Sequence, residues 1–216
     1  MISYAKFEEN CHRLEARIAE ACAAIGRDPG TVRLMPVTKT HPVDAAEFAA
    51  RYGFASVGEN RVQEAMEKIP SGPKGLKWEL IGHLQSNKAK LAVEHFDRVQ
   101  SVDSEKLLQK LDHAAGECGK TLPILLQVNA GDDPAKFGVD CSDSAPLLER
   151  ALGCTHLKVE GLMTIAPLDE DLAVARRAFE RLRDTRDALA SQFGVSLPEL
   201  SMGMSGDIEE AIAAGS

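Results

Sequence analysis

Hydrophobic positions along the chain follow two different periods. Residues 7–25 place apolar side chains at steps of three and four, which is the spacing of one face of a helix, and Gly26 then ends the pattern. These positions are Phe7, Cys11, Leu14, Ile18, Cys22 and Ile25. Residues 32–37 form a short apolar run instead, and helical spacing returns over residues 45–52. The pattern predicts a helix, a strand, a loop and a second helix.

The strand-helix unit then repeats down the chain. The predicted strands comprise residues 32–37, 55–57, 78–81, 98–102, 123–128, 157–165 and 200–204. A helical pattern follows each of them, the last over residues 208–214. This alternation implies parallel strands with crossover helices, which fits either an open doubly wound sheet or a closed eightfold barrel. Seven units favour the barrel.

The predicted fold class is therefore α/β, a TIM-type (β/α)8 barrel without its eighth strand and last helix. The sequence stops at residues 214–216, where that strand would begin. No linker or low-complexity segment divides the repeats. Residues 1–216 are thus expected to form a single barrel domain, truncated at the C-terminus.

Charge and composition exclude several function classes. The chain has 25 Lys and Arg against 33 Asp and Glu, a net charge of −8, which disfavours nucleic acid as a partner. Its five cysteines lack a CxxC pair, which indicates reduced thiols in a cytoplasmic protein. No apolar run approaches the roughly 20 residues of a membrane helix, and no signal-peptide pattern opens the sequence. The six histidines are scattered, so no metal site is predicted.

Candidate chemistry lies in the loops after the strands, because barrels of this kind build their active face there. Lys39 ends the first strand and either reaches for solvent or, when partly desolvated, offers a Schiff-base amine. Asn60 follows the second strand and can act as an N-cap of the next helix. His83 follows the third strand as a satisfied polar residue or a base. Lys136-Phe-Gly138 after the fifth strand and Met163 on the sixth complete the ring.

The last loop, Ser201-Met-Gly-Met-Ser-Gly-Asp207, runs from a strand into a helix. Small residues let backbone N–H groups approach a ligand, and a helix N-terminus favours an anion, so the loop can cradle a phosphate. A plain tight turn with Ser205 or Asp207 as N-cap is the alternative. A serine-hydrolase elbow is excluded because Asp207 stands where the second glycine of GxSxG is required.

Six segments in this order resemble the pyridoxal phosphate homeostasis protein family, single-domain relatives of the alanine racemase barrel. They are Val37-Thr-Lys-Thr40, Gly58-Glu-Asn60, Ile81-Gly-His-Leu-Gln-Ser-Asn-Lys88, Lys136-Phe-Gly138, Gly161-Leu-Met163 and Ser201-Met-Gly-Met-Ser-Gly-Asp207. The resemblance extends over nearly all of the chain from residue 32 onward. One departure is Glu79, where members of the family often have histidine; because it lies within a strand, little consequence for a cofactor is expected.

The resemblance implies a barrel of pyridoxal phosphate (PLP) fold type III that binds PLP as an internal aldimine on Lys39. It further implies that Ser205, Gly206 and the helix N-terminus hold the phosphate. The complete set of residues expected to bind the cofactor is Lys39, Asn60, His83, Met163, Ser201, Ser205 and Gly206.

A racemase needs a base on each face of the cofactor. The only tyrosines, Tyr4 and Tyr52, are predicted on helices, which favours a PLP carrier and homeostasis protein without established catalytic turnover. A monomer is expected, with PLP-accepting apo-enzymes as further candidate partners. Two alternatives stay open: a PLP-dependent amino-acid racemase-like enzyme, and a PLP-free lyase whose Lys39 forms a Schiff base directly with a carbonyl substrate.

Overall fold

The computed structural model describes residues 3–216 and builds them around one parallel sheet; residues 1 and 2 of the expected domain lie outside that range. The sheet has the strand order β1-β2-β3-β4-β5-β6. Its strands are β1 (Ser56–Glu59), β2 (Lys77–Leu80), β3 (Arg98–Val102), β4 (Leu122–Gln127), β5 (Leu157–Met163) and β6 (Glu199–Ser201). Every neighbouring pair is parallel, so the chain returns outside the sheet between successive strands.

Helices provide those returns. The α-helices of residues 3–216 are α1 (Tyr4–Ala24), α2 (Asp44–Tyr52), α3 (Val62–Lys68), α4 (Ala89–His95), α5 (Glu105–Glu117), α6 (Ser144–Leu152), α7 (Leu172–Phe193) and α8 (Ile208–Ala214). Short 3-10 turns are η1 (Pro29–Thr31), η2 (Ile69–Ser71), η3 (Ser86–Lys88) and η4 (Cys141–Asp143). Within the described part of the chain, no helix has the length and apolar character needed to cross a membrane.

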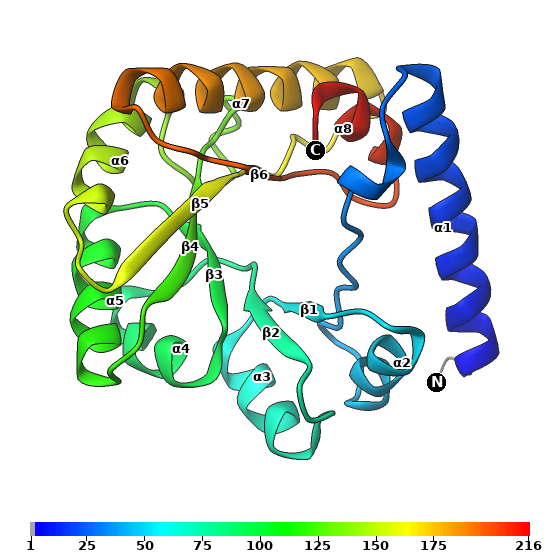
Figure 1. Cartoon of the computed structure of the whole chain (residues 1–216), viewed down its shortest axis with the longest axis horizontal. Helices are drawn as coiled ribbons and strands as arrows, with labels where there is room; N and C mark the ends of the chain where they lie inside the picture. The colour runs from blue at the N-terminus through cyan, green and yellow to red at the C-terminus, as the bar shows by residue number, and fades with distance from the viewer. Residues whose placement is uncertain (1–2) are drawn as a thin grey trace.

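Figure 1 shows the strands curling around a common centre with the helices outside them. This is the predicted barrel architecture. Residues 3–216 contain no eighth strand, and the sheet stays open between β6 and the segment that leads into Lys39. Helix α8 packs against both α1 and α7 on that side.

The first predicted strand, over residues 32–37, is wrong as a strand. The segment meets β1 at a single isolated bridge, Val37 with Gly58. Thr38 N donates to Gly58 O at 3.0 Å, and Gly58 N donates to Pro36 O at 2.8 Å. Pro36 has no N–H to donate, so a longer ladder cannot form there. The segment is still extended beside β1, which sets the position of Lys39.

The last predicted strand, over residues 200–204, is shorter than expected. β6 ends at Ser201, and Gly203 adopts a φ of +90°. That left-handed conformation turns the chain away from the sheet and is one that glycine adopts at little cost. The strand therefore gives way to a loop three residues earlier than the apolar run suggests.

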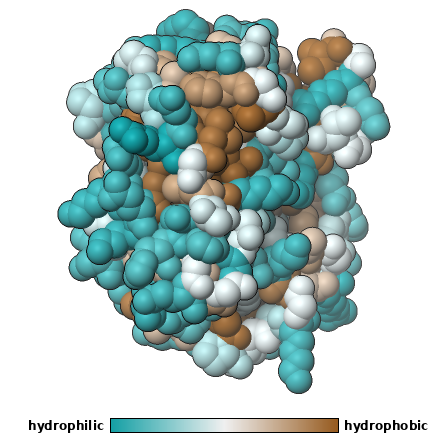
Figure 2. Space-filling view, turned by 60° about the vertical axis from the view of Figure 1, so that its left-hand side comes forward, coloured by the Kyte–Doolittle hydropathy of each residue, from teal (hydrophilic) through white to brown (hydrophobic). Residues whose placement is uncertain are grey.

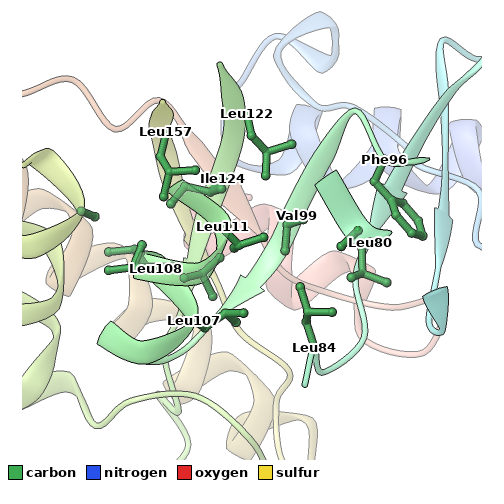
Figure 3. Packing of buried hydrophobic residues seen from close by; sticks show 14 of the residues in the cluster. Leu80, Leu84, Phe96, Val99, Leu107, Leu108, Leu111, Leu122, Ile124 and Leu157 are labelled. Atoms are coloured by element: carbon green, nitrogen blue, oxygen red, sulfur yellow. The ribbon is translucent and has the colours of Figure 1, made fainter. Parts of the chain in front are cut away.

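The hydrophobic core lies between the outer face of the sheet and the helices. Figure 3 shows Leu108 and Leu111 of α5 facing Ile124 of β4. All three side chains are at most 1% exposed. Burying one such side chain contributes about 1.5–3 kcal/mol relative to leaving it in water. Because this packing lies outside the sheet, it leaves the interior and the strand ends free for polar groups.

The interior of the curled sheet holds an ion-pair network centred on Arg98 of β3. Its guanidinium contacts Glu79 of β2 at 2.9 Å, Glu160 of β5 at 2.9 Å and Glu199 of β6 at 3.2 Å. Contacts from β3 to β6 are possible only because the sheet curls. Arg33 of the first segment also reaches Glu199, at 2.5 Å, so the same carboxylate links the two open edges.

Gln100 extends this network toward the strand ends. Its amide donates to Glu79 Oε2 at 2.6 Å, and its oxygen accepts a hydrogen bond from Ser201 Oγ at 2.6 Å. Glu79, the residue that departs from the resemblance, is thus a buried partner of both Arg98 and Gln100. Its role in this chain is to satisfy interior donors.

Replacing Arg98 with Met should destabilise the protein by about 3–5 kcal/mol, because three carboxylates would lose their shared buried cation. Arg150→Ala is the matched control, because the Arg150 side chain is 67% exposed and its ion pair with Glu105 is long, at 3.7 Å. This variant should change stability by about 0.5 kcal/mol at most. Urea denaturation of both variants measures the difference. Equal stability of the two variants would contradict the role given to Arg98.

Candidate functional site

Lys39 lies at the carboxyl edge of the sheet with its side chain exposed to solvent. The residue before it, Thr38, is 2% exposed and hydrogen-bonded to β1. The residue after it, Thr40, has a φ of +64°, which is uncommon for any residue except glycine. The chain therefore turns sharply just beyond Lys39 and leaves the lysine at the bend.

Charged side chains of β1 and α3 surround this bend. Lys68 Nζ donates to Glu59 Oε1 at 2.7 Å, to Glu64 Oε1 at 2.7 Å and to Thr38 O at 2.8 Å. Although burial raises the pKa of Glu64, hydrogen bonds from Lys68 and the Thr40 backbone bring it below its ordinary value. Glu64 and Lys68 were not among the residues predicted for the site, although their i,i+4 spacing was an available signal.

Asn60 follows β1 but is not the N-cap of the next helix, so that prediction is wrong. The cap position belongs to Arg61, which makes no side-chain capping bond, and α3 starts at Val62. Asn60 instead lies against the loop after β2. A Cβ added to Gly82 would stand 2.1 Å from Asn60 O, so the two loops approach each other at a position that only glycine allows.

His83, next to Gly82, is held by two partners. Its Nδ1 is 3.3 Å from Asp103 Oδ2, and its ring stacks on Phe137 with centroids 3.8 Å apart and planes 8° apart. Phe137 comes from the loop after β4 and is 55% exposed. The structure thus joins the loops after β2 and β4 through the contacts of His83.

Met163 and Ser201 face each other as register partners at the ends of β5 and β6. Met163 is 4% exposed, so its side chain belongs to the packed part of the strand end. The Ser201 hydroxyl donates to Gln100 in the interior. Its hydrogen is therefore already used within the protein.

The loop after β6 is open at Ser205 and Gly206. Both residues are exposed, and a Cβ on Gly206 would meet nothing within 4 Å. Among residues 3–216, neither the Ser205 hydroxyl nor the Gly206 N–H has a hydrogen-bond partner. Asp207 holds the cap position of α8, but its carboxylate accepts from Met204 N, at 2.5 Å, and not from a helix N–H.

Arg17 of α1 supports this loop from outside. Its guanidinium donates to the Ser205 carbonyl at 2.8 Å and to both carboxylate oxygens of Glu209, at 2.6 and 2.7 Å. The hydrogen bond from Arg17 lowers the pKa of Glu209. The sequence analysis gave no signal for Arg17, because the contact joins the first and last helices of the chain.

All seven predicted site residues lie at the carboxyl end of the sheet, in two groups. Lys39, Asn60 and His83 adjoin one another through β1 and the contact between Gly82 and Asn60. The second group comprises Met163, Ser201, Ser205 and Gly206, at the ends of β5 and β6. Parallel strand direction accounts for this gathering, since it brings every strand-end loop to one edge. The arrangement offers an exposed amine on one side and an open loop with free donors on the other.

A recess of about 930 Å³ between α5 and α6 contains none of these seven residues. Asp112, His113 and His156 line it together with Cys154. Figure 2 brings the α5 and α6 side of the molecule forward; most of this view is hydrophilic, and a hydrophobic patch lies in its upper half. No group of three or more metal-ligating side chains occurs anywhere within residues 3–216. The recess therefore stands apart from the strand-end site.

Comparison with known proteins first defines the class. Residues 2–215 match the family model described as "Alanine racemase, N-terminal domain". An alanine racemase from Clostridium difficile superposes with a TM-score of 0.73 at 14% identity, covering 90% of this chain and 51% of that one, which shows a shared fold. The chain is thus a barrel of the alanine racemase type.

Closer relatives then give the particular family. A pyridoxal phosphate homeostasis protein from Pseudomonas aeruginosa is 39% identical over 208 residues, 96% of this chain and 89% of the relative. PipY of Synechococcus elongatus, solved with PLP bound, is 40% identical with a TM-score of 0.79, covering 92% of this chain and 94% of that one. The chain belongs to the pyridoxal phosphate homeostasis protein family, and the resemblance read from its motifs is confirmed.

Gly82→Ala should cost about 1–3 kcal/mol of stability, because the new methyl group would overlap the Asn60 carbonyl and push apart the loops after β1 and β2. Gly153→Ala is the control: Gly153 has a φ of −80° and its nearest contact is at 3.4 Å, so alanine fits there. Thermal unfolding of both variants gives the comparison. A Gly82 variant as stable as the Gly153 variant would show that the two loops can separate freely.

Proposed function

We propose that this protein binds PLP covalently through Lys39 and serves as a carrier in PLP homeostasis. The observation that carries the proposal is that two features share one edge of the sheet. The exposed amine of Lys39 lies in one group of strand ends, and the open loop of Ser205 and Gly206, with its free donors, lies in the other. The PLP bound in PipY, at 40% identity, supports it. PLP would supply an aldehyde with which the neutral amine of Lys39 could condense, with loss of one water.

The residues of the site fit such a ligand. Ser205 and the Gly206 N–H would hold the phosphate, because both have unused donors next to open space. Asn60, His83, Met163 and Ser201 would border the ring. Of these, His83 and Ser201 would act from positions fixed by Asp103 and Gln100.

The positions of the two tyrosines favour a carrier role over racemisation. Tyr52 donates its hydroxyl to Glu15 at 2.8 Å and stacks on Phe54, and burial raises its pKa. Tyr4 stacks beside Phe7 in the same cluster of α1 and α2. Both phenols lie in this helical cluster, so neither supplies a second base at the strand ends.

Two alternative functions predict different chemistry. A racemase-like enzyme would exchange the α-proton of an amino acid with solvent when PLP is present. A PLP-free lyase would let borohydride trap a keto acid or sugar on Lys39 with no PLP added. The carrier predicts neither result, and predicts a visible absorbance band that borohydride removes.

The setting proposed for this carrier is the cytoplasm, where it would act as a monomer and pass PLP to apo-enzymes. Its cysteines support a reducing compartment: all five occur as free thiols, and Cys11 and Cys22 are buried. Sedimentation of the pure protein and transfer of PLP to an apo-enzyme test the monomer and the delivery role.

Lys39→Ala should abolish the visible absorbance that develops with PLP and leave the melting temperature within about 1 °C, since an exposed side chain contributes little packing. Lys110→Ala, which removes an exposed lysine of α5, should keep the full absorbance. Persistence of wild-type absorbance in the Lys39 variant would show that another group holds the cofactor.

Ser205→Ala should weaken PLP retention without preventing attachment to Lys39. A hydrogen bond to a charged group contributes about 1.5–3 kcal/mol, which corresponds to a loss of roughly 10- to 150-fold in affinity. Dialysis of the loaded protein measures retention, with Ser191→Ala on the exposed face of α7 as control. Pyridoxal without phosphate should bind both variants equally; a selective loss for pyridoxal would remove Ser205 from the phosphate site.

A further inference from the structure

The backbone on both sides of Lys39 is held by charged side chains. The Thr38 carbonyl accepts a hydrogen bond from Lys68 Nζ at 2.8 Å, and the Thr38 hydroxyl donates to Glu59 Oε1 at 2.6 Å. Thr40 gives its N–H to Glu64 Oε1 at 2.5 Å. Each neighbour of Lys39 is thus tied to a charged group of β1 or α3.

The three charged groups form one connected unit, in which only Glu59 Oε2 is buried without a hydrogen-bond partner. The Lys68 ammonium has three donors, and its three acceptors are Glu59, Glu64 and the Thr38 carbonyl. Glu59 is fully buried, and the Lys68 side chain is 9% exposed. Glu64 and Lys68 are i,i+4 neighbours on α3. The unit therefore links the end of β1, one helix and the Lys39 bend.

Stability alone is a weak reason for such a unit. Taking charges out of water costs several kcal/mol per ion, and well-packed apolar residues of similar volume often stabilise a fold as well or better. What the ions add is a fixed geometry. The geometry fixed here includes Thr40 at φ +64°, a conformation that costs about 1–3 kcal/mol for a residue other than glycine.

We propose that Glu59, Glu64 and Lys68 are positioning residues that hold the Lys39 bend so that the lysine amine stays directed to the cofactor site. The proposal rests on the proposed function, because it concerns the reactivity of Lys39 toward PLP. Lys68 and Glu64 act on the backbone of Thr38 and Thr40, and Glu59 acts on the Thr38 hydroxyl. They set how readily the amine meets the aldehyde, while the phosphate and ring are held by other residues.

The test separates the speed of bond formation from binding. Stopped-flow absorbance follows the reaction of PLP with wild type and variants, and calorimetry measures the affinity for pyridoxine 5′-phosphate, which has the ring and phosphate but no aldehyde. Glu64→Ala frees the Thr40 N–H and should slow bond formation about tenfold, in line with the cost of misplacing a reacting group. Its affinity for pyridoxine 5′-phosphate should stay within about twofold of wild type.

Three companion variants make the result specific. Glu64→Gln keeps an oxygen for Thr40 and Lys68, so it should restore most of the wild-type rate. Glu67→Ala removes an exposed carboxylate from the same helix and should leave the rate unchanged. Thr38→Val tests the contact on the other side of Lys39, because it removes the hydroxyl that donates to Glu59 and keeps the side-chain volume. It should slow the reaction by about threefold.

Three outcomes overturn the proposal. A wild-type rate in both Glu64→Ala and Thr38→Val would show that the bend needs no such support. A parallel loss of rate and of pyridoxine 5′-phosphate affinity would show a general effect on the site. Failure of the wild type itself to attach PLP at Lys39, seen before any variant is compared, would refute the proposed function and with it this inference.

Discussion

Every strand of the sheet runs in the same direction, and the site depends on that constraint. Parallel strands need crossovers, and the crossovers are helices that bury their apolar faces on the outside of the sheet. The loops that follow the strands then meet at one edge. Lys39 and the loop of Ser205 are 166 positions apart in the sequence and share that edge for this reason alone.

The curled sheet encloses a second, electrostatic layer. Arg98 ties β2, β5 and β6 together through three carboxylates, and Gln100 continues the connection to Ser201 at the mouth. Barrel interiors are more often filled by branched apolar side chains. Charges in a low-dielectric interior are tolerated only when each has partners, so this network restricts the relative positions of the strands. The same principle recurs at the end of β1, where Lys68 links two carboxylates to the Lys39 bend.

Hydrophobic periodicity predicted the helices and the order of the strands, because each depends on local spacing. It failed where one residue changes local backbone chemistry: Pro36 prevents the first ladder, and Gly203 ends the last strand early. Asn60 has the side chain of an N-cap, yet the helix starts a residue later than a cap there requires. The long-range pairs of Arg98 and Arg17 were beyond sequence reasoning, because they depend on which elements meet in space.

The central claim is that Lys39 is the residue to which PLP attaches. Peptide mapping by mass spectrometry, after wild-type protein is incubated with PLP and reduced with borohydride, tests it most directly. The account predicts a pyridoxyl adduct on the peptide that contains Lys39, at one per chain. An adduct spread over exposed lysines such as Lys110, or no adduct at all, would contradict it.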